Sequence, residues 1–484
     1  MAESLEREKV CDEKEHFVLA DYDAFGFDLD HTLAKYNLIP LFELIYSSLT
    51  DYLVEVKGYD KDLLKPFRNF KKFCTRGLVL DCEAGKLLKL DQDGRILRAS
   101  HGTTLLSNEE IEALYGKERR WSHADELLGN VNNFREFRIF ENFFDMPGAV
   151  VSARVIDIID KRLGGRQEKY TFWPDVIGAF NYTYTPQHFP DMKGGYFPDK
   201  FRNLPKYVSE CTKEVKQWLK LLRENKRVVY VMTSSRADLG VFILKHILGE
   251  DWRDYFDISL FYARKPGFFT EKRPFLSVDD VHESSPVEKL ECGKLYSQGN
   301  VNVLMDYIKQ KVGKENPKVV YFGDSVRSDV FPSKVHANWE TVLILEELEA
   351  EGMQKHPRKI RHHHEDTTNK NGADDDDDEP ICKKMKNHIK EPPRQEKDYL
   401  TSDHWGSFFF DDINMTEAER KGDCYMNTFW GLLIRKYADI CVPQLDYLTD
   451  FPLDHKFEVF NHEKKQTSGF YPSPPVSLAK VEDS

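Results

Sequence analysis

Three short apolar runs, each ending in an acidic or hydroxyl side chain, constrain the fold of this 484-residue chain more than any other feature. They span residues 22–28 (YDAFGFD), 227–233 (RVVYVMT) and 318–324 (KVVYFGD). Short runs rich in Val, Tyr and Phe are typical of strands that are buried on both faces of a parallel sheet. Helix-length segments at 208–223 and 301–311 precede the last two runs. The alternation predicts an α/β fold, a Rossmann-like doubly wound parallel sheet with helices on both faces.

A crossover between two parallel strands needs about a dozen residues, and the chain between the first and second runs is far longer than that. Residues 38–205 are therefore expected to form a large α+β cap, inserted within a core of residues 21–345. Residues 1–20 are charged and aperiodic, which predicts a flexible arm. Residues 346–398 are polar and highly charged, which predicts a disordered linker, and residues 399–484 are expected to form a helical segment that packs on the core.

Some local elements can also be predicted within these regions. Residues 75–99 alternate between apolar and polar side chains and contain an Asp-Gly pair, which predicts a β-hairpin. Residues 134–162 are expected to be helical, and residues 194–198 to form a loop. Residues 427–447 are amphipathic enough for a helix.

Composition restricts the partners and the compartment. Lys and Arg total 69 against 82 Asp and Glu, and a formal charge of −13 without a basic patch argues against nucleic acid as a partner. No apolar stretch approaches the about eighteen residues of a membrane-spanning helix, and the N-terminus lacks the pattern of a signal peptide. The eight cysteines form no C-x-x-C pair, so reduced thiols and a cytoplasmic protein without a membrane partner are expected.

The polar linker contains two concentrated charge patterns: His362-His363-His364 and the acidic run 374–379. The histidines could hold a metal ion and the acidic run could bind a basic partner. A solvated tract is the preferred interpretation of both.

The ends of the predicted strands carry the chemistry, because ligands of open α/β sheets bind at the carboxyl ends of the strands. The first run is followed by Asp28 and Asp30, two carboxylates that can divide nucleophilic and proton-transfer work if a cation suppresses their repulsion. The second ends in hydroxyls suited to phosphate oxygens: Thr233, Ser234 and Ser235. The third supplies Asp324 and Asp329, further ligands for a hard cation such as Mg²⁺, and Lys265 offers a positive charge between them.

Each of these motifs is weak alone, but their order resembles the haloacid dehalogenase (HAD) superfamily of phosphohydrolases. The resemblance is closer to the cytosolic purine 5′-nucleotidase family and its 5′-nucleotidase domain-containing relatives, over residues 22–345 and 400–455. The segments that carry it are FGFDLDHTLAKY (25–36), TRGLVLD (75–81), FFDMP (143–147), ARKPGF (263–268) and RKYAD (435–439).

The resemblance implies that Asp28 attacks phosphorus to form an aspartyl-phosphate, and that Asp30 protonates the leaving oxygen and then activates water. It also implies that Thr233 and Lys265, with Ser234 and Ser235 beside Thr233, hold the phosphoryl oxygens. A Mg²⁺ cofactor would bind the side chain of Asp28, the main-chain carbonyl of Asp30 and the side chain of Asp324, with Asp329 nearby. Loose phosphoryl transfer depends mainly on positioning and charge neutralisation, which such a site provides.

The same resemblance implies an altered substrate site. Phe144 matches a cap aromatic that stacks on a base, although a buried core position fits it equally well. An Arg and an Asp of the purine enzymes fall on Ile177 and Asn181, and a Gln and an Arg fall on Leu433 and Lys436. A site built for charged hydrogen bonds loses orders of magnitude without them, so weak or altered purine recognition is expected, with Lys436 as the remaining polar candidate.

The sequence thus predicts a Mg²⁺-dependent phosphomonoesterase of the 5′-nucleotidase group, whose small-molecule partner is a nucleotide or a related phosphomonoester. Two alternatives remain open: a phosphate-binding regulatory or scaffold protein with negligible turnover, and a phosphotransferase in which a nucleoside intercepts the aspartyl-phosphate. A homo-oligomer is compatible with the resemblance. Four aromatics of the cap are expected in the core rather than in the pocket: Phe172, Trp173, Tyr182 and Tyr184.

Overall fold

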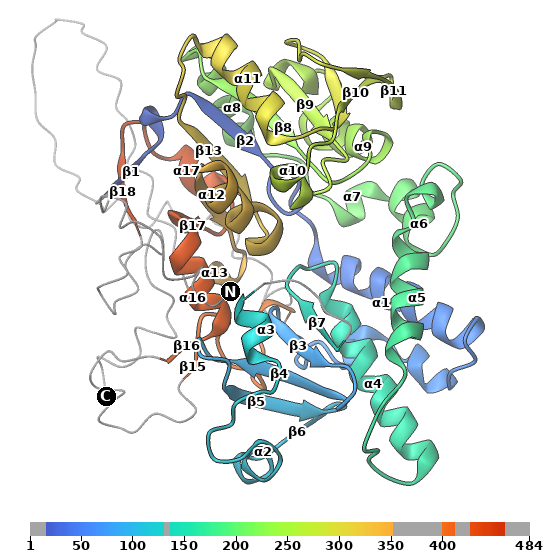
Figure 1. Ribbon diagram of the computed structural model, residues 1–484. Helices are drawn as coiled ribbons and strands as arrows, with labels where there is room; N and C mark the ends of the chain where they lie inside the picture. Colours follow the sequence, from blue (N-terminus) through green and yellow to red (C-terminus); the bar gives the residue numbers. More distant parts are fainter. Residues whose placement is uncertain (1–15, 130–135, 352–398, 412–425, 460–484) are drawn as a thin grey trace, which may run out of the picture.

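A computed structural model describes residues 16–129, 136–351, 399–411 and 426–459 (Figure 1). Its largest element is a nine-stranded sheet with the order β11-β10-β12-β9-β8-β2-β13-β14-β17. Neighbouring strands from β12 to β17 are parallel, whereas β10 pairs antiparallel with both β11 and β12. The strands are β2 (Ala24–Phe27), β8 (Val228–Met232), β9 (Ile258–Phe261), β10 (Phe275–Asp279), β11 (His282–Val287), β12 (Leu295–Gln298), β13 (Val319–Gly323), β14 (Glu340–Ile344) and β17 (Ile440–Val442).

The three strands predicted from the apolar runs are confirmed as β8, β2 and β13, which are neighbours within this sheet and are buried throughout. Side chains alternate between the two faces, as the period of a strand requires. Phe25 and Phe27 of β2 contact Trp218 of α8 (Lys213–Glu224) edge to face, whereas Ala24 belongs to a second cluster with Leu304 of α11 (Val301–Val312). Helices therefore cover both faces, and the predicted doubly wound α/β fold is confirmed.

The core helices divide between the same two apolar clusters. Residues of α8, α9 and α17 belong to one cluster, and residues of α10 and α11 to the other. The helices are α8 (Lys213–Glu224), α9 (Ala237–Leu248), α10 (Gly267–Thr270), α11 (Val301–Val312), α12 (Phe331–Ala337), α13 (Glu347–Ala350), α16 (Phe429–Tyr437) and α17 (Asp446–Thr449). The helix expected at 208–223 begins later, because the Thr212 side chain caps it by accepting a hydrogen bond from the Val215 amide.

The chain between β2 and α8 forms an antiparallel sheet flanked by helices, in the lower and right-hand parts of Figure 1. Its strands, in the order β6-β5-β4-β3-β7, are β3 (Leu78–Asp81), β4 (Lys86–Leu90), β5 (Ile96–His101), β6 (Thr104–Leu105) and β7 (Phe137–Phe140). The predicted hairpin is confirmed as β4 and β5. The helices are α1 (Leu38–Glu55), α2 (Asn108–Tyr115), α3 (Ala124–Gly129), α4 (Met146–Leu163), α5 (Trp173–Tyr184), α6 (Tyr196–Arg202) and α7 (Leu204–Tyr207).

Two local predictions for this region are wrong. Residues 137–140, expected within a helix, form the edge strand β7, because they pair with β3 from Leu78 to Asp81. The helix begins only at Met146. Residues 196–198, expected in a loop, form the first turn of α6, where Tyr196 and Phe197 are buried.

The C-terminal segment is not purely helical, which corrects the expectation for residues 427–447. Helix α16 ends at Tyr437, and the next residues form β17, which extends the core sheet in parallel beside β14. Asp439 supports this change of direction, because its carboxylate accepts hydrogen bonds from the Thr341 amide and from Lys334. A short antiparallel pair, β15 (Phe410–Asp411) with β16 (Met426–Asn427), precedes the helix.

The predicted arm and linker need correction where the structure describes them. His16–Val18 form strand β1, which pairs antiparallel with β18 (Lys456–Glu458), so this part of the expected arm is a strand. Glu347 begins helix α13 and is buried, so the core continues past the expected boundary at residue 345. The triple histidine, the acidic run and residues 1–15 lie outside the described residues.

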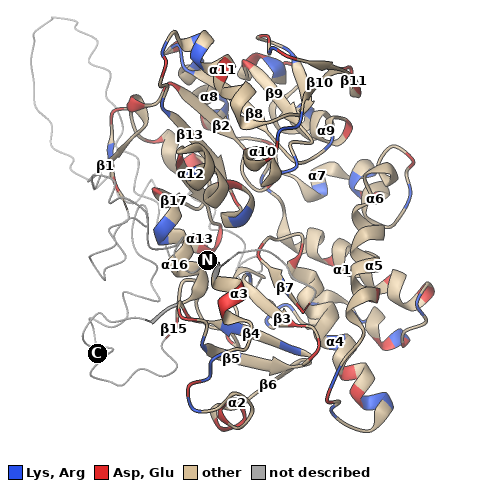
Figure 2. Ribbon diagram, in the orientation of Figure 1, with Lys and Arg blue, Asp and Glu red and all other residues tan. Residues whose placement is uncertain are grey.

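Positively and negatively charged residues are both spread over the helices and loops, whereas the central strands carry few charged residues (Figure 2). Within the described part of the chain, no helix combines the length and apolar character needed to cross a membrane. The described cysteines are free thiols, namely Cys74, Cys82, Cys211, Cys292 and Cys441.

Candidate active site

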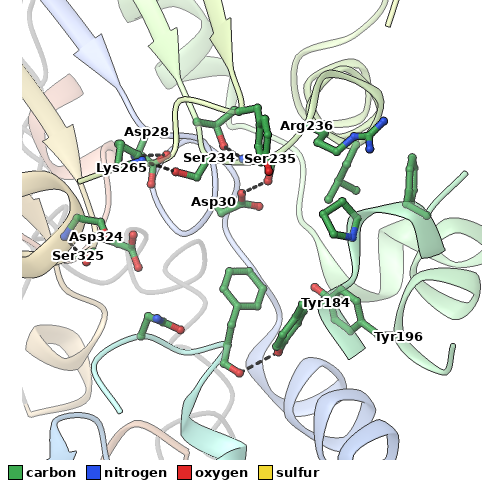
Figure 3. A pocket seen from close by; sticks show the side chains of 18 of the residues that line it. Asp28, Asp30, Tyr184, Tyr196, Ser234, Ser235, Arg236, Lys265, Asp324 and Ser325 are labelled. Carbon is green, nitrogen blue, oxygen red and sulfur yellow. Dashed lines mark hydrogen bonds and ion pairs between the residues drawn. The ribbon is translucent and has the colours of Figure 1, made fainter. Parts of the chain in front are cut away.

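A cavity of about 370 Å³ lies between the carboxyl end of the core sheet and the cap helices (Figure 3). Its core wall comes from the segments that follow β2, β8, β9 and β13, and its cap wall from α5, α6 and the segments beside them. Nine of the predicted site residues line it: Asp28, Asp30, Phe144, Thr233, Ser234, Ser235, Lys265, Asp324 and Asp329.

Asp28 lies directly after β2, where its backbone amide donates a hydrogen bond to the carbonyl of Phe322 on the neighbouring strand. Its carboxylate lies 2.8 Å from the Lys265 ammonium. Burial raises the pKa of Asp28 to about 7, against the opposing charge of Lys265 and with the added repulsion of Asp329 and Asp30. A carboxylate in this setting is desolvated and only partly neutralised.

Asp28, Asp324 and Asp329 form a buried carboxylate cluster, with ligand atoms within 4.8 Å of one another. Gly323 permits this approach, because a Cβ at that position would lie 2.4 Å from the Cβ of Asp329. Burial and the charge of Asp329 raise the pKa of Asp324 well above its usual range. Lys265, 2.5 Å from Asp329, supplies part of the missing positive charge. Carboxylate oxygens that repel one another in a buried site fit a hard divalent cation such as Mg²⁺.

Asp30 is held by hydroxyl groups on both of its oxygens. Ser235 donates to Oδ2 at 2.8 Å, and Tyr36 donates to Oδ1 at 2.5 Å. Its carboxylate therefore has a fixed orientation at the cavity wall, as Figure 3 shows for the contact with Ser235.

The hydroxyl segment after β8 lies between the two aspartates and Lys265. The Thr233 amide donates to the carbonyl of Leu260, and its hydroxyl accepts a hydrogen bond from the Ser235 amide. The Ser234 hydroxyl accepts a hydrogen bond from the Lys265 amide at 3.1 Å. Burial alone would lower the pKa of the Lys265 ammonium, but Asp28 and Asp329 raise it above its ordinary value. The lysine is therefore a stable cation beside hydroxyls that suit phosphoryl oxygens.

Aromatic side chains form much of the cap wall. Phe144 lies there, and its carbonyl accepts a hydrogen bond from the Tyr184 hydroxyl at 2.9 Å. Tyr184 itself lines the cavity, which corrects its expected core position. Phe172 and Trp173 are buried in the core as predicted.

Lys436 does not reach the cavity, which corrects its place among the predicted substrate-binding residues. It lies on the exposed side of α16, with its ammonium 5.1 Å from the Tyr437 ring. The opposite side of this helix is buried, and Trp430 donates a hydrogen bond to the carbonyl of Gly77. Leu433, Ile177 and Asn181 are also absent from the cavity wall. The positions that the resemblance matched to the charged and amide nucleoside contacts therefore do not meet at this cavity.

Several residues that the sequence did not single out support the site. Arg76 donates to the carbonyl of Asp324 at 2.5 Å and pairs with Glu347 at 3.4 Å. Glu141 accepts a hydrogen bond from the Ser325 hydroxyl at 2.9 Å. Arg76 belongs to one of the segments that carry the family resemblance, and that is the one signal that pointed toward it. Glu141 follows a strand that the sequence did not reveal.

The fold and the cavity together define an α/β protein with polar groups at the carboxyl end of the sheet and a cap above them. The chain belongs to the 5′ nucleotidase family, whose family model matches residues 14–465. It is 38% identical to the human protein "5′-nucleotidase domain-containing protein 1" over 97% of this chain and 98% of that protein. It is 29% identical to human "5′-nucleotidase domain-containing protein 2" over 69% of this chain and 62% of that protein.

Among solved structures, a putative phosphatase from Clostridium difficile aligns at 13% identity over 67% of this chain and 86% of that chain. Its TM-score of 0.25 is too low to define a shared fold. Membership of the family therefore rests on the sequence comparisons, which support a phosphatase or nucleotidase enzyme.

Proposed function

We propose that the protein is a Mg²⁺-dependent phosphomonoesterase that acts through an aspartyl-phosphate on Asp28. The observation that carries the proposal is the convergence of Asp28, Asp30 and Lys265 with Asp324 and Asp329 on one cavity. A nucleoside monophosphate or a related small phosphomonoester is the proposed substrate, in keeping with the family to which the chain belongs.

In the first step, an oxygen of Asp28 attacks phosphorus and the bond from phosphorus to the leaving oxygen breaks. Asp30 gives its proton to that leaving oxygen, so the alcohol departs neutral. In the second step, water attacks the phosphorus of the aspartyl-phosphate and Asp30 takes up a proton from it. The bond between Asp28 and phosphorus then breaks and inorganic phosphate leaves.

The remaining polar groups hold the phosphoryl oxygens in line with Asp28. Thr233 and Ser234 present hydroxyls next to Lys265, whose ammonium is 2.8 Å from the attacking carboxylate. Phosphoryl transfer gains most from such positioning and from neutralised charge.

Asp28, Asp324 and the main-chain carbonyl of Asp30 are the proposed ligands of Mg²⁺, with Asp329 nearby. When bound, the cation would neutralise the charge that builds up on the phosphoryl oxygens. The buried carboxylates, whose charges Lys265 balances only in part, support this assignment.

The cap wall supports a leaving group with a flat apolar part. Phe144, Tyr184 and Tyr196 face the cavity with Phe189 and Phe197, and such rings stack on planar groups. The positions matched to the charged and amide contacts of the purine enzymes (Ile177, Asn181, Leu433 and Lys436) do not line this cavity, so we propose altered base preference. A cytoplasmic location, which free thiols favour, is part of the same proposal.

Phosphate release from a panel of phosphomonoesters, with and without Mg²⁺, tests the function. Wild type should release phosphate only with the metal, and Asp28→Asn should abolish release. Asp306→Asn is the matched control, because Asp306 is exposed on α11 and does not line the cavity. Silence of the wild type on the whole panel would favour a phosphate-binding protein, and new monophosphates formed from added nucleosides would reveal a phosphotransferase.

A further inference from the structure

A buried lysine that the proposed mechanism does not use lies in the cap. Lys200 belongs to α6 and lines the cavity, yet the residue is only 1% exposed. Within the described parts of the chain, no carboxylate lies within ion-pair distance of its ammonium. A buried ammonium without an anionic partner destabilises a fold, so its presence points to a role in function.

Aromatic side chains surround this ammonium. Its Nζ lies 4.7 Å from the ring centroid of Tyr36, 5.3 Å from that of Tyr196 and 5.9 Å from that of Phe144. It also donates hydrogen bonds to the hydroxyls of Tyr36 at 2.8 Å and Tyr196 at 3.2 Å. These contacts fix the ammonium in one place and cover it from solvent.

One of these hydroxyls connects the lysine to the catalytic machinery. The Tyr36 hydroxyl accepts the hydrogen bond from Lys200 and donates its own proton to Asp30 at 2.5 Å. Hydrogen bonds in such a chain polarise one another, and the effect is larger where charge is buried. The positive charge of Lys200 therefore strengthens the hold of Tyr36 on the Asp30 carboxylate.

We infer that Lys200 is a positioning residue that acts on Asp30 through Tyr36, and that it supports protonation of the leaving oxygen. The inference rests on the proposed function of Asp30. The ammonium is engaged by the hydroxyls of Tyr36 and Tyr196, so its role is assigned to positioning rather than to substrate contact. Its charge stabilises the carboxylate that Asp30 becomes as its proton passes to the leaving oxygen, and Ser235 holds the other carboxylate oxygen in place.

Leaving groups of different basicity test this role. An alkyl phosphate, such as a nucleoside 5′-monophosphate, needs a proton on its leaving oxygen, whereas p-nitrophenyl phosphate releases a stable anion and does not. We expect Lys200→Met and Tyr36→Phe to lower kcat/KM by about 10-fold or more on the alkyl phosphate, through kcat. On p-nitrophenyl phosphate the same variants should lose less than about 3-fold, because the weakened step is not needed there.

Lys206→Met is the matched control, because Lys206 lies on the adjoining helix α7 with a side chain that is 57% exposed. In the Asp30→Asn background, Lys200→Met should cause no further loss, since the two residues act on the same step. Tyr36→Phe keeps the ring and serves as the second variant if Lys200→Met does not fold.

Equal losses on both substrates, an effect on KM alone, or full additivity with Asp30→Asn would overturn the inference. Those outcomes leave the proposed function intact if the wild type still turns over substrate in an Asp28-dependent reaction. If the wild type turns over neither ester, or if Asp28→Asn stays active, the proposed function fails and the inference fails with it.

Discussion

Replacement of Arg76 by Met should destabilise the whole molecule, because one buried guanidinium holds three separate segments. Arg76 precedes β3 of the cap and donates to the carbonyls of Glu141 at 2.6 Å and Asp324 at 2.5 Å. It also pairs with Glu347 of α13 at 3.4 Å, and both side chains are 1% exposed. The cap, the carboxylate cluster and the start of the C-terminal region thus depend on the same group.

The magnitude follows from what the change leaves behind. Arg76→Met leaves the Glu347 carboxylate buried without its cation, and breaking a buried ion pair in this way costs about 3–5 kcal/mol. The two carbonyls would also lose donors, but these costs overlap and are not simply added. A loss of about 3–5 kcal/mol is a large fraction of the about 5–15 kcal/mol by which a typical domain is stable.

Urea unfolding without Mg²⁺, followed by fluorescence, measures this loss. Arg95→Met is the matched control, because Arg95 is exposed on the cap, and its change should stay within about 0.5 kcal/mol. Glu347→Gln, added to Arg76→Met, should restore part of the loss because it removes the unpaired charge. A loss below about 1 kcal/mol for Arg76→Met, or no recovery in the double variant, would refute the reasoning.

Two further predictions concern charge in and near the cavity. Burial lowers the pKa of Lys200 from 10.5 to about 8. Between pH 8 and pH 10.5 this lysine is therefore more protonated in the unfolded chain than in the folded one. Its contribution to the free energy of unfolding rises with pH over that range. The difference between the unfolding free energies of wild type and Lys200→Met should therefore change by up to about 3 kcal/mol in favour of wild type between pH 8 and 10.5. A difference that stays constant over this range would contradict the lowered pKa of Lys200. Mg²⁺ at about 100 times its Kd should stabilise wild type by about 2.7 kcal/mol. Asp324→Asn should lose this response to Mg²⁺ in thermal scans. Without metal it should be at least as stable as wild type, because the substitution relieves the repulsion within the carboxylate cluster. An unchanged response to Mg²⁺ would argue against the cluster as the metal site.

The centre of the fold could be predicted because its strands are buried on both faces. Such runs stand out in the sequence, and the residues that follow them meet at one edge by the geometry of parallel sheets. Asp28, Thr233 and Asp324 could therefore be predicted from the sequence alone. Lys265 follows β9, a strand that the sequence did not reveal. This lysine could be predicted as a site residue only from its place between the second and third motifs.

Other features were hidden for physical reasons. Strands β7 and β17 have four and three residues, too few to display a period, and each depends on pairing with a distant strand. Lys200 lies in the mixed segment YFPDKFR, where no local pattern marks the lysine as buried, and only the tertiary fold surrounds its ammonium with rings. The predicted substrate contact of Lys436 is wrong, because a match of residue types within a helix does not determine which side of that helix faces the cavity.

Direct detection of phosphorylated Asp28 tests the central claim most directly. Wild type mixed with a ³²P-labelled phosphomonoester that it hydrolyses and Mg²⁺, then quenched in acid within the first turnover, should carry label on the peptide that contains Asp28. The same label should be absent from Asp28→Asn and present in Asp306→Asn. Turnover of the labelled ester by the wild type without any label on that peptide would contradict an aspartyl-phosphate at Asp28.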